Sequence, residues 1–492
     1  MHVKAVIVFD PSQKPPAPIG GMSEEEALAE ARLLYYYASV HVEPQDRRSQ
    51  SSLIQGVVEF TKFVRQSDPV GDETEPLYIE TDQLLYLVTP MTDSEGKIFL
   101  AIIFDRAMIR SKKYAKMILQ RFQTYYHLFH GNVESQMKAG FSLGMTMDDF
   151  VPSFISAETQ LSSSIKMAPI AIRYAPVGAH ALVAVHSLGL ELLTEFQPTI
   201  SGFAILYRGF LVSSSVEAHS LVALYSYLAL NTMSGDVSNT KLLRPPYGRI
   251  GTAAIAPGGG SSAFGRCNFF DAENSSHGFL FGPTGSGEAV FSPQIFFPSE
   301  KGSRYLVAYI INGVMVIVFT RESPEFTFLK RLEAYLTDNS EFSEETLSLL
   351  RTDFAKAVET SGSTDEKFNV VYFNNQTKSM IPFDSSSSQG KDFKRSASLF
   401  AARFLTPFGS RIIQEGSQGE DVAANIDMLI DENPDIANVS VKASSNDGWK
   451  VFIRRGKDRE IRFDFKDSKV PLWKVNSEIS HFLNVRFDSV AL

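Results

Sequence analysis

The stretch KIFLAIIF, residues 97–104, decides the expected fold. As a strand it places Ile98 and Leu100 on one face and Phe99 and Ala101 on the other, because successive side chains of a strand point to opposite sides. Since both faces carry apolar residues, both must be covered by other parts of the chain. The stretch therefore predicts a central strand in a sheet with helices on both sides.

Around this strand, one order of elements occurs three times: strands, a helix, more strands, and one or two helices. The first round has expected strands at 3–9, 32–37, 83–89 and 97–104 and expected helices at 53–64 and 113–130. The second has a 202–213 hairpin, a 216–230 helix, strands at 277–281 and 295–297, a 305–320 hairpin, and helices at 325–336 and 344–359. The third has strands at 368–373, 439–443, 450–454 and 460–465 and helices at 394–405, 420–431 and 472–482.

Short-range signals support this order. Asn312-Gly313 is typical of a type I′ turn between two strands, and Arg208-Gly209 is the expected turn of the earlier hairpin. Three helices are expected to begin with capping boxes, in which a Ser and a Glu or Gln side chain satisfy each other's backbone N–H groups. These pairs are Ser52/Gln55, Ser214/Glu217 and Ser417/Glu420.

The length of 492 residues, at roughly 150 residues per domain, predicts about three domains. We therefore expect an α/β protein of three α/β/α modules, each a mainly antiparallel sheet with helices on both faces. Their expected boundaries are 1–165, 166–362 and 363–492.

Composition excludes several classes of protein. A net charge of −9 disfavours a protein that grips nucleic acid through bulk positive charge. Cys267 is the single cysteine, which excludes an intrachain disulfide or a multi-cysteine metal site and favours a reducing compartment such as the cytosol. The apolar run at the N-terminus is too short for a signal peptide, and 305–320 is too short to span a membrane.

Candidate catalytic and metal-binding motifs are weak. Gly282 and Gly287 have the spacing of a phosphate-binding loop, but Glu288 replaces the phosphate-binding Lys and would repel phosphate. His127 and His130 lie three residues apart without a third metal ligand nearby, and we expect both on the surface. The sequence therefore predicts no catalytic residue, no metal and no cofactor.

The expected helix 53–64 is more informative, because its apolar residues cover more of its circumference than one sheet face can bury. Gly56 would also allow another backbone to approach closely. Two interpretations stay open: tight packing inside its own domain, or an interface with another subunit or a GTPase. The candidate binding residues are Leu53, Ile54, Gly56, Val57, Val58 and Phe60.

Positive charge gathers in two places despite the acidic total. One cluster is Arg106, Arg110, Lys112, Lys113, Lys116 and Arg121, near the start of the 113–130 helix. The other lies in the last expected hairpin, where Arg454, Arg455, Lys457 and Arg459 are candidate ligands for lipid phosphate. Because Asp458 and Glu460 dilute this cluster, a solvated sheet edge that blocks aggregation is the alternative.

Several segments resemble Ccz-type vacuolar fusion proteins. They are VIVFDPS, RLLYYYAS and QGVVEFTKFV in the first module, YYHLFHG at 125–131, VVYFNNQ at 370–376, and the tail from VKASSNDGWKVFIRRGKDRE through LWKVNSEIS. The first-module motif is also similar to planar-polarity effector and Hermansky-Pudlak trafficking proteins, whereas the tail favours the Ccz family. The Pro-rich loop at 14–18 and the Gly/Ser-rich loop at 244–276 have no counterpart in this resemblance.

The resemblance implies three longin domains and a constitutive partner, Mon. With Mon, Ccz proteins form a guanine-nucleotide exchange factor for the late-endosomal Rab GTPase, on a phosphoinositide-containing membrane. It also implies no metal, no nucleotide site of its own and no covalent chemistry. The alternatives are a scaffold subunit of another longin-type trafficking complex and, from a different class, a phosphate-loop enzyme, which Glu288 argues against.

Overall fold

The structure is a computed structural model, and its described residues fall into three groups of ranges. The first group is 3–14, 23–67, 76–91, 98–107, 112–138 and 142–163. The second is 172–175, 177–232, 266–268, 277–281, 290–298, 302–338 and 344–362. The third is 368–374, 379–383, 438–445, 448–455, 459–465, 470–471, 473–475 and 477–479.

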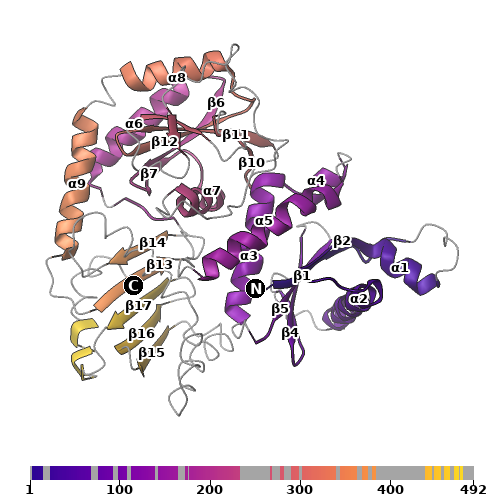
Figure 1. Ribbon diagram of the computed structural model, residues 1–492. Coiled ribbons are helices and arrows are strands. Elements are labelled where there is room, and N and C mark those ends of the chain that lie inside the picture. The colour runs from indigo at the N-terminus through magenta and orange to yellow at the C-terminus, as the bar shows by residue number, and fades with distance from the viewer. Residues whose placement is uncertain are drawn as a thin grey trace. The chain divides into compact units, whose positions relative to one another are not determined.

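The described chain is a mixed α/β protein with three β-sheets that share one strand order (Figure 1). Numbered along the chain within each sheet, the order of the common five strands is 2-1-5-4-3: β2-β1-β5-β4-β3, β7-β6-β12-β11-β9 and β14-β13-β17-β16-β15. The first and third sheets are antiparallel throughout. The chain divides into two compact units, one formed mainly by Met1–Gln160 and the other mainly by the residues from Leu161 onward.

The first sheet is built around β5, as its sequence predicts. Its strands are β1 (Val3–Phe9), β2 (Leu33–Ala38), β3 (Leu77–Glu80), β4 (Leu84–Pro90) and β5 (Phe99–Asp105). Its helices are α1 (Glu24–Arg32), α2 (Pro44–Ser67), α3 (Lys112–His130), α4 (Val133–Lys138) and α5 (Leu143–Ser163). From Phe99 to Phe104 no side chain of β5 is more than 8 % exposed, which confirms that both faces of this strand are covered.

Helices lie on both sides of this sheet. Phe99, Ala101 and Ile103 of β5 share a core cluster with Ile54 and Val58 of α2. The other side carries α3 and α5 (Figure 1). Two consecutive residues of β2 mark the two layers, because the Tyr35 hydroxyl donates to the Met147 carbonyl of α5 and the Tyr36 hydroxyl donates to Gln50 of α2.

The second sheet also packs between helices. Its strands are β6 (Ile200–Tyr207), β7 (Phe210–Ser214), β8 (Arg266–Asn268), β9 (His277–Phe281), β10 (Gln294–Phe296), β11 (Ser303–Ile311) and β12 (Val314–Thr320). Three helices, α6 (Ala179–Glu195), α8 (Phe326–Asp338) and α9 (Glu344–Gly362), share a core cluster with one face. The fourth, α7 (Ala218–Thr232), has its Tyr225 hydroxyl on the Gly209 carbonyl at the β6–β7 turn.

The third sheet contains β13 (Phe368–Asn374), β14 (Ser379–Phe383), β15 (Asn438–Ser445), β16 (Gly448–Arg455) and β17 (Arg459–Phe465). Ile461 and Phe463 of β17 are buried, as are Val475 and Ile479 in short helical turns that follow it. The expected helices 394–405 and 420–431 lie outside the described residues, as does the Ser417/Glu420 pair.

Both predicted hairpin turns are confirmed. Arg208 and Gly209 have φ values of 45° and 82°, and Asn312 and Gly313 have φ values of 49° and 83°. The second turn joins Ile311 to Val314, which are paired across β11 and β12. Positive φ at both central residues is what a type I′ turn requires, and the Gly at the second position meets it without steric cost.

Two predicted capping boxes are wrong. Ser52 lies inside α2, which begins at Pro44 rather than at residue 53, and the Gln55 amide instead donates to the Ser51 hydroxyl at 3.0 Å. Ser214 ends β7, where its hydroxyl accepts from the Val216 N–H at 2.9 Å, and α7 begins only at Ala218.

The described residues contain four helices that the pattern of apolar residues did not predict: α1, α4, α5 and α6. The α5 sequence carries Pro152 inside the helix, and Pro usually argues against one. In α6 apolar residues occur nearly all round, so no polar face marks the helical period, and Gly189 lies where a Cβ would collide with the Phe203 ring. No helix among the described residues has the length and apolar character that crossing a membrane requires.

Candidate partner-binding surface

One side of α2 belongs to the core of the first unit. Ile54 is fully buried and Val58 is 4 % exposed, and both contact the sheet residues of the core cluster. Ser51 and Gln55 are also buried, and the Gln55 amide donates to the Ser51 hydroxyl. Of the six candidate binding residues, Ile54 and Val58 thus stabilise their own domain, as the first of the two open interpretations supposes.

A second side of α2 is apolar and exposed. Leu53 is 47 % exposed and Phe60 is 67 % exposed, and Gly56 lies between them along the helix. The spacing of three and four residues places these three on one face, with the half-buried Val57 at its border. A Cβ added at Gly56 would meet no atom within 4 Å, so none of the described residues uses the close approach that this glycine permits. We call Leu53, Gly56 and Phe60 the exposed stripe.

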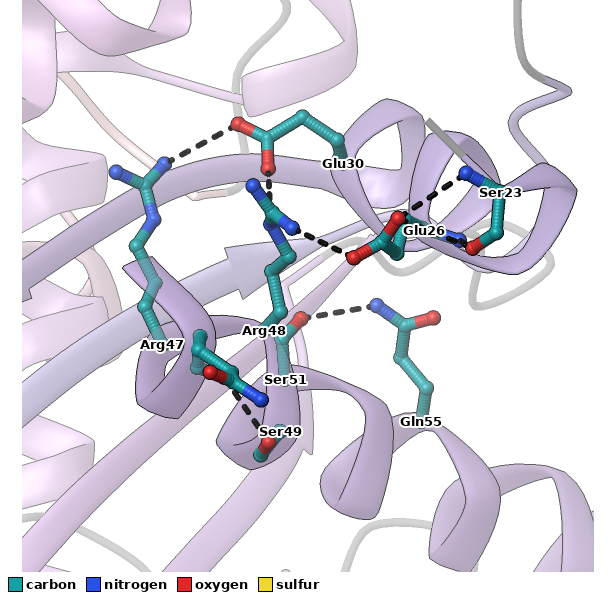
Figure 2. Close-up of polar contacts among 9 residues, drawn as sticks. Ser23, Glu26, Glu30, Arg47, Arg48, Ser49, Ser51 and Gln55 are labelled. Atoms are coloured by element: carbon teal, nitrogen blue, oxygen red, sulfur yellow. Dashed lines mark hydrogen bonds and ion pairs between the residues drawn. The ribbon is translucent and has the colours of Figure 1, made fainter. Parts of the chain in front are cut away.

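The third side of α2 contacts α1 through charged residues. Glu26 of α1 pairs with Arg48 at 3.0 Å, and Glu30 pairs with Arg48 at 3.7 Å and with Arg47 at 4.0 Å. Figure 2 shows Arg48 between the two glutamates, with Arg47 beside it. Near the other end of α1, Arg32 pairs with Glu59 at 3.1 Å. These four ion pairs, which we call the clasp, hold α1 along one border of the exposed stripe.

A capping box begins α1. The Ser23 hydroxyl accepts from the Glu26 N–H at 3.2 Å, and the Glu26 carboxylate accepts from the Ser23 N–H at 3.0 Å (Figure 2). The Ser23 N–H and the Ser23 hydroxyl both donate to the Glu26 carboxylate, and these two bonds, together with the nearby Arg48, lower the pKa of Glu26 below its usual value of 4.5. The sequence signal Ser-x-x-Glu was present at 23–26, so this helix start could have been predicted from it.

The first basic cluster is not a free positive surface. Arg121 is 2 % exposed and forms a bidentate pair with Glu158 of α5, with distances of 2.8 Å and 2.6 Å. Arg106 and Lys112 both pair with Glu80. Arg110 lies outside the described residues. Three of its six cations, Arg106, Lys112 and Arg121, therefore have acidic partners, which reduces the positive charge at the start of α3.

The second basic cluster is divided by the backbone register of the third sheet. Arg454 lies opposite Glu460, whereas Arg455 lies opposite Arg459. Since consecutive strand residues belong to opposite faces, positions 454 and 455 are on different sides of the sheet. Lys457 lies outside the described residues. Positions 455 and 459 are therefore the two cations of this cluster that the register places opposite each other.

The candidate catalytic motifs gain no support. Residues 282–289 lie outside the described ranges, and the chain that follows is strand and loop, as expected, rather than the helix that a phosphate-binding loop requires. His130 is buried and stacks on Tyr126 with ring centroids 4.7 Å apart, so its expected position on the surface is wrong. Within the described ranges, His, Cys, Asp and Glu side chains form no group able to hold a metal ion.

The comparisons with known proteins do not identify the chain: no family model matches it, and no curated protein matches its sequence.

Proposed function

We propose that this chain is the Ccz-type subunit of a two-subunit guanine-nucleotide exchange factor for a late-endosomal Rab GTPase. The observation that carries the proposal is the exposed stripe, since a helix that buries one side on its own sheet and exposes Leu53 and Phe60 on another has surface for a partner. Under this proposal the chain is not an enzyme with covalent chemistry, and it needs no cofactor.

The proposed architecture is three longin domains. The order 2-1-5-4-3 recurs in all three sheets, which supports an origin of the chain in one repeated module. Helices on both faces of the first two sheets support the same interpretation. In the first module α2 is the helix that follows the first two strands, and we propose that its exposed stripe contacts the Mon-type subunit.

The proposed mechanism is differential binding. An exchange factor that binds the nucleotide-free GTPase more tightly than the loaded form shifts the GTPase toward the nucleotide-free state. The GTPase switch segments are held by the bound phosphate and magnesium, so a surface that deforms them weakens both contacts. Such a step needs a large protein interface, and it needs no acid, base or metal from this chain.

Membrane attachment is proposed at the C-terminal hairpin. Each Lys or Arg near an anionic leaflet contributes about 1 kcal/mol, and the field decays within about 8 Å at physiological salt, so only clustered cations have a useful effect. The proposed ligands are Arg454, Arg455, Lys457 and Arg459. Because the register pairs Arg454 with Glu460, we expect Arg455 and Arg459 to contribute more than Arg454.

The test is exchange activity with and without the partner. The chain is co-expressed with a Mon-type subunit, and release of fluorescent GDP is measured across a panel of Rabs, with the isolated chain measured in parallel. We expect release from a late-endosomal Rab by the complex only. Full activity of the isolated chain would contradict the proposal, and a stable complex that acts on no Rab would favour a scaffold subunit of another longin-type assembly.

A further inference from the structure

The exposed stripe has an acidic border. α1 contains four glutamates and one arginine in nine residues, and the clasp holds it against α2. Glu24 is exposed, and the side chains of Glu26 and Glu30 remain 47 % and 48 % exposed although they pair with Arg48. α1 and the three clasp residues of α2 together contain five glutamates and three arginines, so two negative charges remain in excess after the ion pairs are formed. A partner that covers Leu53 and Phe60 meets this excess along one side of the contact.

This border excludes two of the possible occupants. A second copy of the chain, docked by a two-fold axis, would bring the same acidic helix to the contact twice, and like charges facing each other oppose association. A membrane leaflet is anionic and attracts basic segments, so acidic α1 would be repelled from it. The chemistry that remains is a different protein with an apolar anchor and basic residues beside it.

We infer that the surface formed by α1 and the exposed stripe docks an amphipathic helix of a different protein, whose apolar residues are flanked by Lys or Arg. This rests on the proposed function in that the same face of α2 contacts the partner. Leu53 and Phe60 supply apolar contact, and Gly56 lets the partner helix approach the α2 backbone. The glutamates of α1 select the basic flank and orient the helix.

The ion pairs of the clasp hold α1 in place beside α2. Among the residues of α1 whose exposure is described, none is buried, so its position depends on the ion pairs to Arg47, Arg48 and Glu59 rather than on a core of its own. Electrostatic complementarity acts mainly on encounter and specificity, and it weakens as salt screens exposed charges. The preference for a basic helix should therefore decrease with salt, whereas the apolar contact should not.

The test uses two synthetic helical peptides that share one leucine face and differ only in flanking Lys or Glu residues. Binding to the full chain is measured by fluorescence anisotropy at low and high salt. We expect the Lys peptide to bind about tenfold more tightly at low salt, with the difference mostly lost at high salt. Phe60→Asp should weaken binding of both peptides.

A matched pair of variants separates local from overall charge. Glu24→Lys/Glu25→Lys changes two glutamates at the start of α1, and Glu344→Lys/Glu345→Lys makes the same change at the start of α9. The α1 variant should lose the preference for Lys, and the α9 variant should keep it. An equal effect of the two variants would overturn the inference, since bulk charge would then explain the preference.

Two further outcomes would overturn it. One is sedimentation of the unmodified chain as a dimer that Phe60→Asp dissociates, which would make a second copy the occupant. The other is binding to phosphatidylserine vesicles that Phe60→Asp abolishes, which would make lipid the occupant. Neither the peptides nor these assays contain a Mon-type subunit or a Rab. The binding results on this surface can therefore be interpreted even if the proposed exchange activity is not found.

Discussion

The two sides of the first sheet are built differently. On the α3–α5 side, Arg121 and Glu158 form a buried bidentate pair, and burial raises the pKa of the neighbouring Tyr125 well above its usual range. Phe122 and Phe150 pack edge to face beside them, with ring centroids 5.1 Å apart. On the α1–α2 side, the charged pairs are exposed and an apolar stripe remains uncovered. The α3–α5 side buries its charged pair, whereas the α1–α2 side leaves Leu53 and Phe60 exposed.

Removing one partner of the buried pair should give the largest loss of stability. Arg121→Ala leaves Glu158 as an uncompensated buried charge, and we expect a cost of about 3–5 kcal/mol. Chemical denaturation of the first unit measures it. The double variant Arg121→Met/Glu158→Leu should recover most of the loss, because it removes both charges. A small effect of Arg121→Ala alone would show that this side is not closed by the pair.

The two sides of α2 should respond differently to truncation. Ile54→Ala leaves a cavity against the sheet and should lower the free energy of unfolding by about 2–4 kcal/mol. Phe60→Ala removes an exposed ring and should change it by less than about 0.5 kcal/mol. The same denaturation experiment compares them directly. Equal losses would mean that Phe60 is covered in the folded chain.

The clasp should be weak and sensitive to salt. Arg48→Ala removes two charged contacts, to Glu26 and Glu30, at partly exposed positions, and we expect a loss of about 0.5–1 kcal/mol at low salt. Hydrogen exchange of α1 at low and high salt measures it. An Arg48→Ala effect that does not change with salt would point to packing of the arginine stem rather than to its charge.

The smallest expected effect is a local loosening of α1 in acid. The pKa of Glu26 is lower in the folded chain than its usual value of 4.5, so its contribution is fully present above that pH. It is lost as the pH falls through the lower, folded value. Hydrogen exchange at the first turn of α1 should therefore rise in this acidic window, while exchange in β5 stays slow. Ser23→Ala should raise exchange already at neutral pH, and an unchanged profile would contradict the capping box.

The features that the sequence predicted correctly are those set by residues close together in the chain. Apolar residues on both faces of 97–104 identified the central strand. Asn312-Gly313 identified a turn, because these two residues readily adopt the positive φ angles that the turn requires. The exposed stripe was only half predicted, because the excess of apolar residues on α2 did not say which ones the sheet would bury. Ile54 and Leu53 are adjacent and chemically similar, and only tertiary packing separates them.

Charge clusters were the least predictable feature. Arg121 lies three and four residues from the apolar Ile118 and Tyr125, yet its partner Glu158, which lets its charge be buried, lies 37 residues away. The clasp likewise joins α1 to α2 across 22 residues between Glu26 and Arg48. Ion pairs between residues so far apart in the sequence depend on the fold. The sequence alone therefore could not show that cations of the first cluster have acidic partners, and it could not locate the glutamates of α1 beside the exposed stripe.

The central claim is that the exposed stripe binds the Mon-type subunit, and the affinity of two matched variants tests it most directly. Met145 of α5 is 73 % exposed and Phe60 of α2 is 67 % exposed, so Met145→Asp and Phe60→Asp place the same charge at similarly exposed apolar positions. We predict that Phe60→Asp weakens binding of the purified subunit by about tenfold or more and that Met145→Asp leaves it unchanged. Equal affinities for the two variants would contradict the claim.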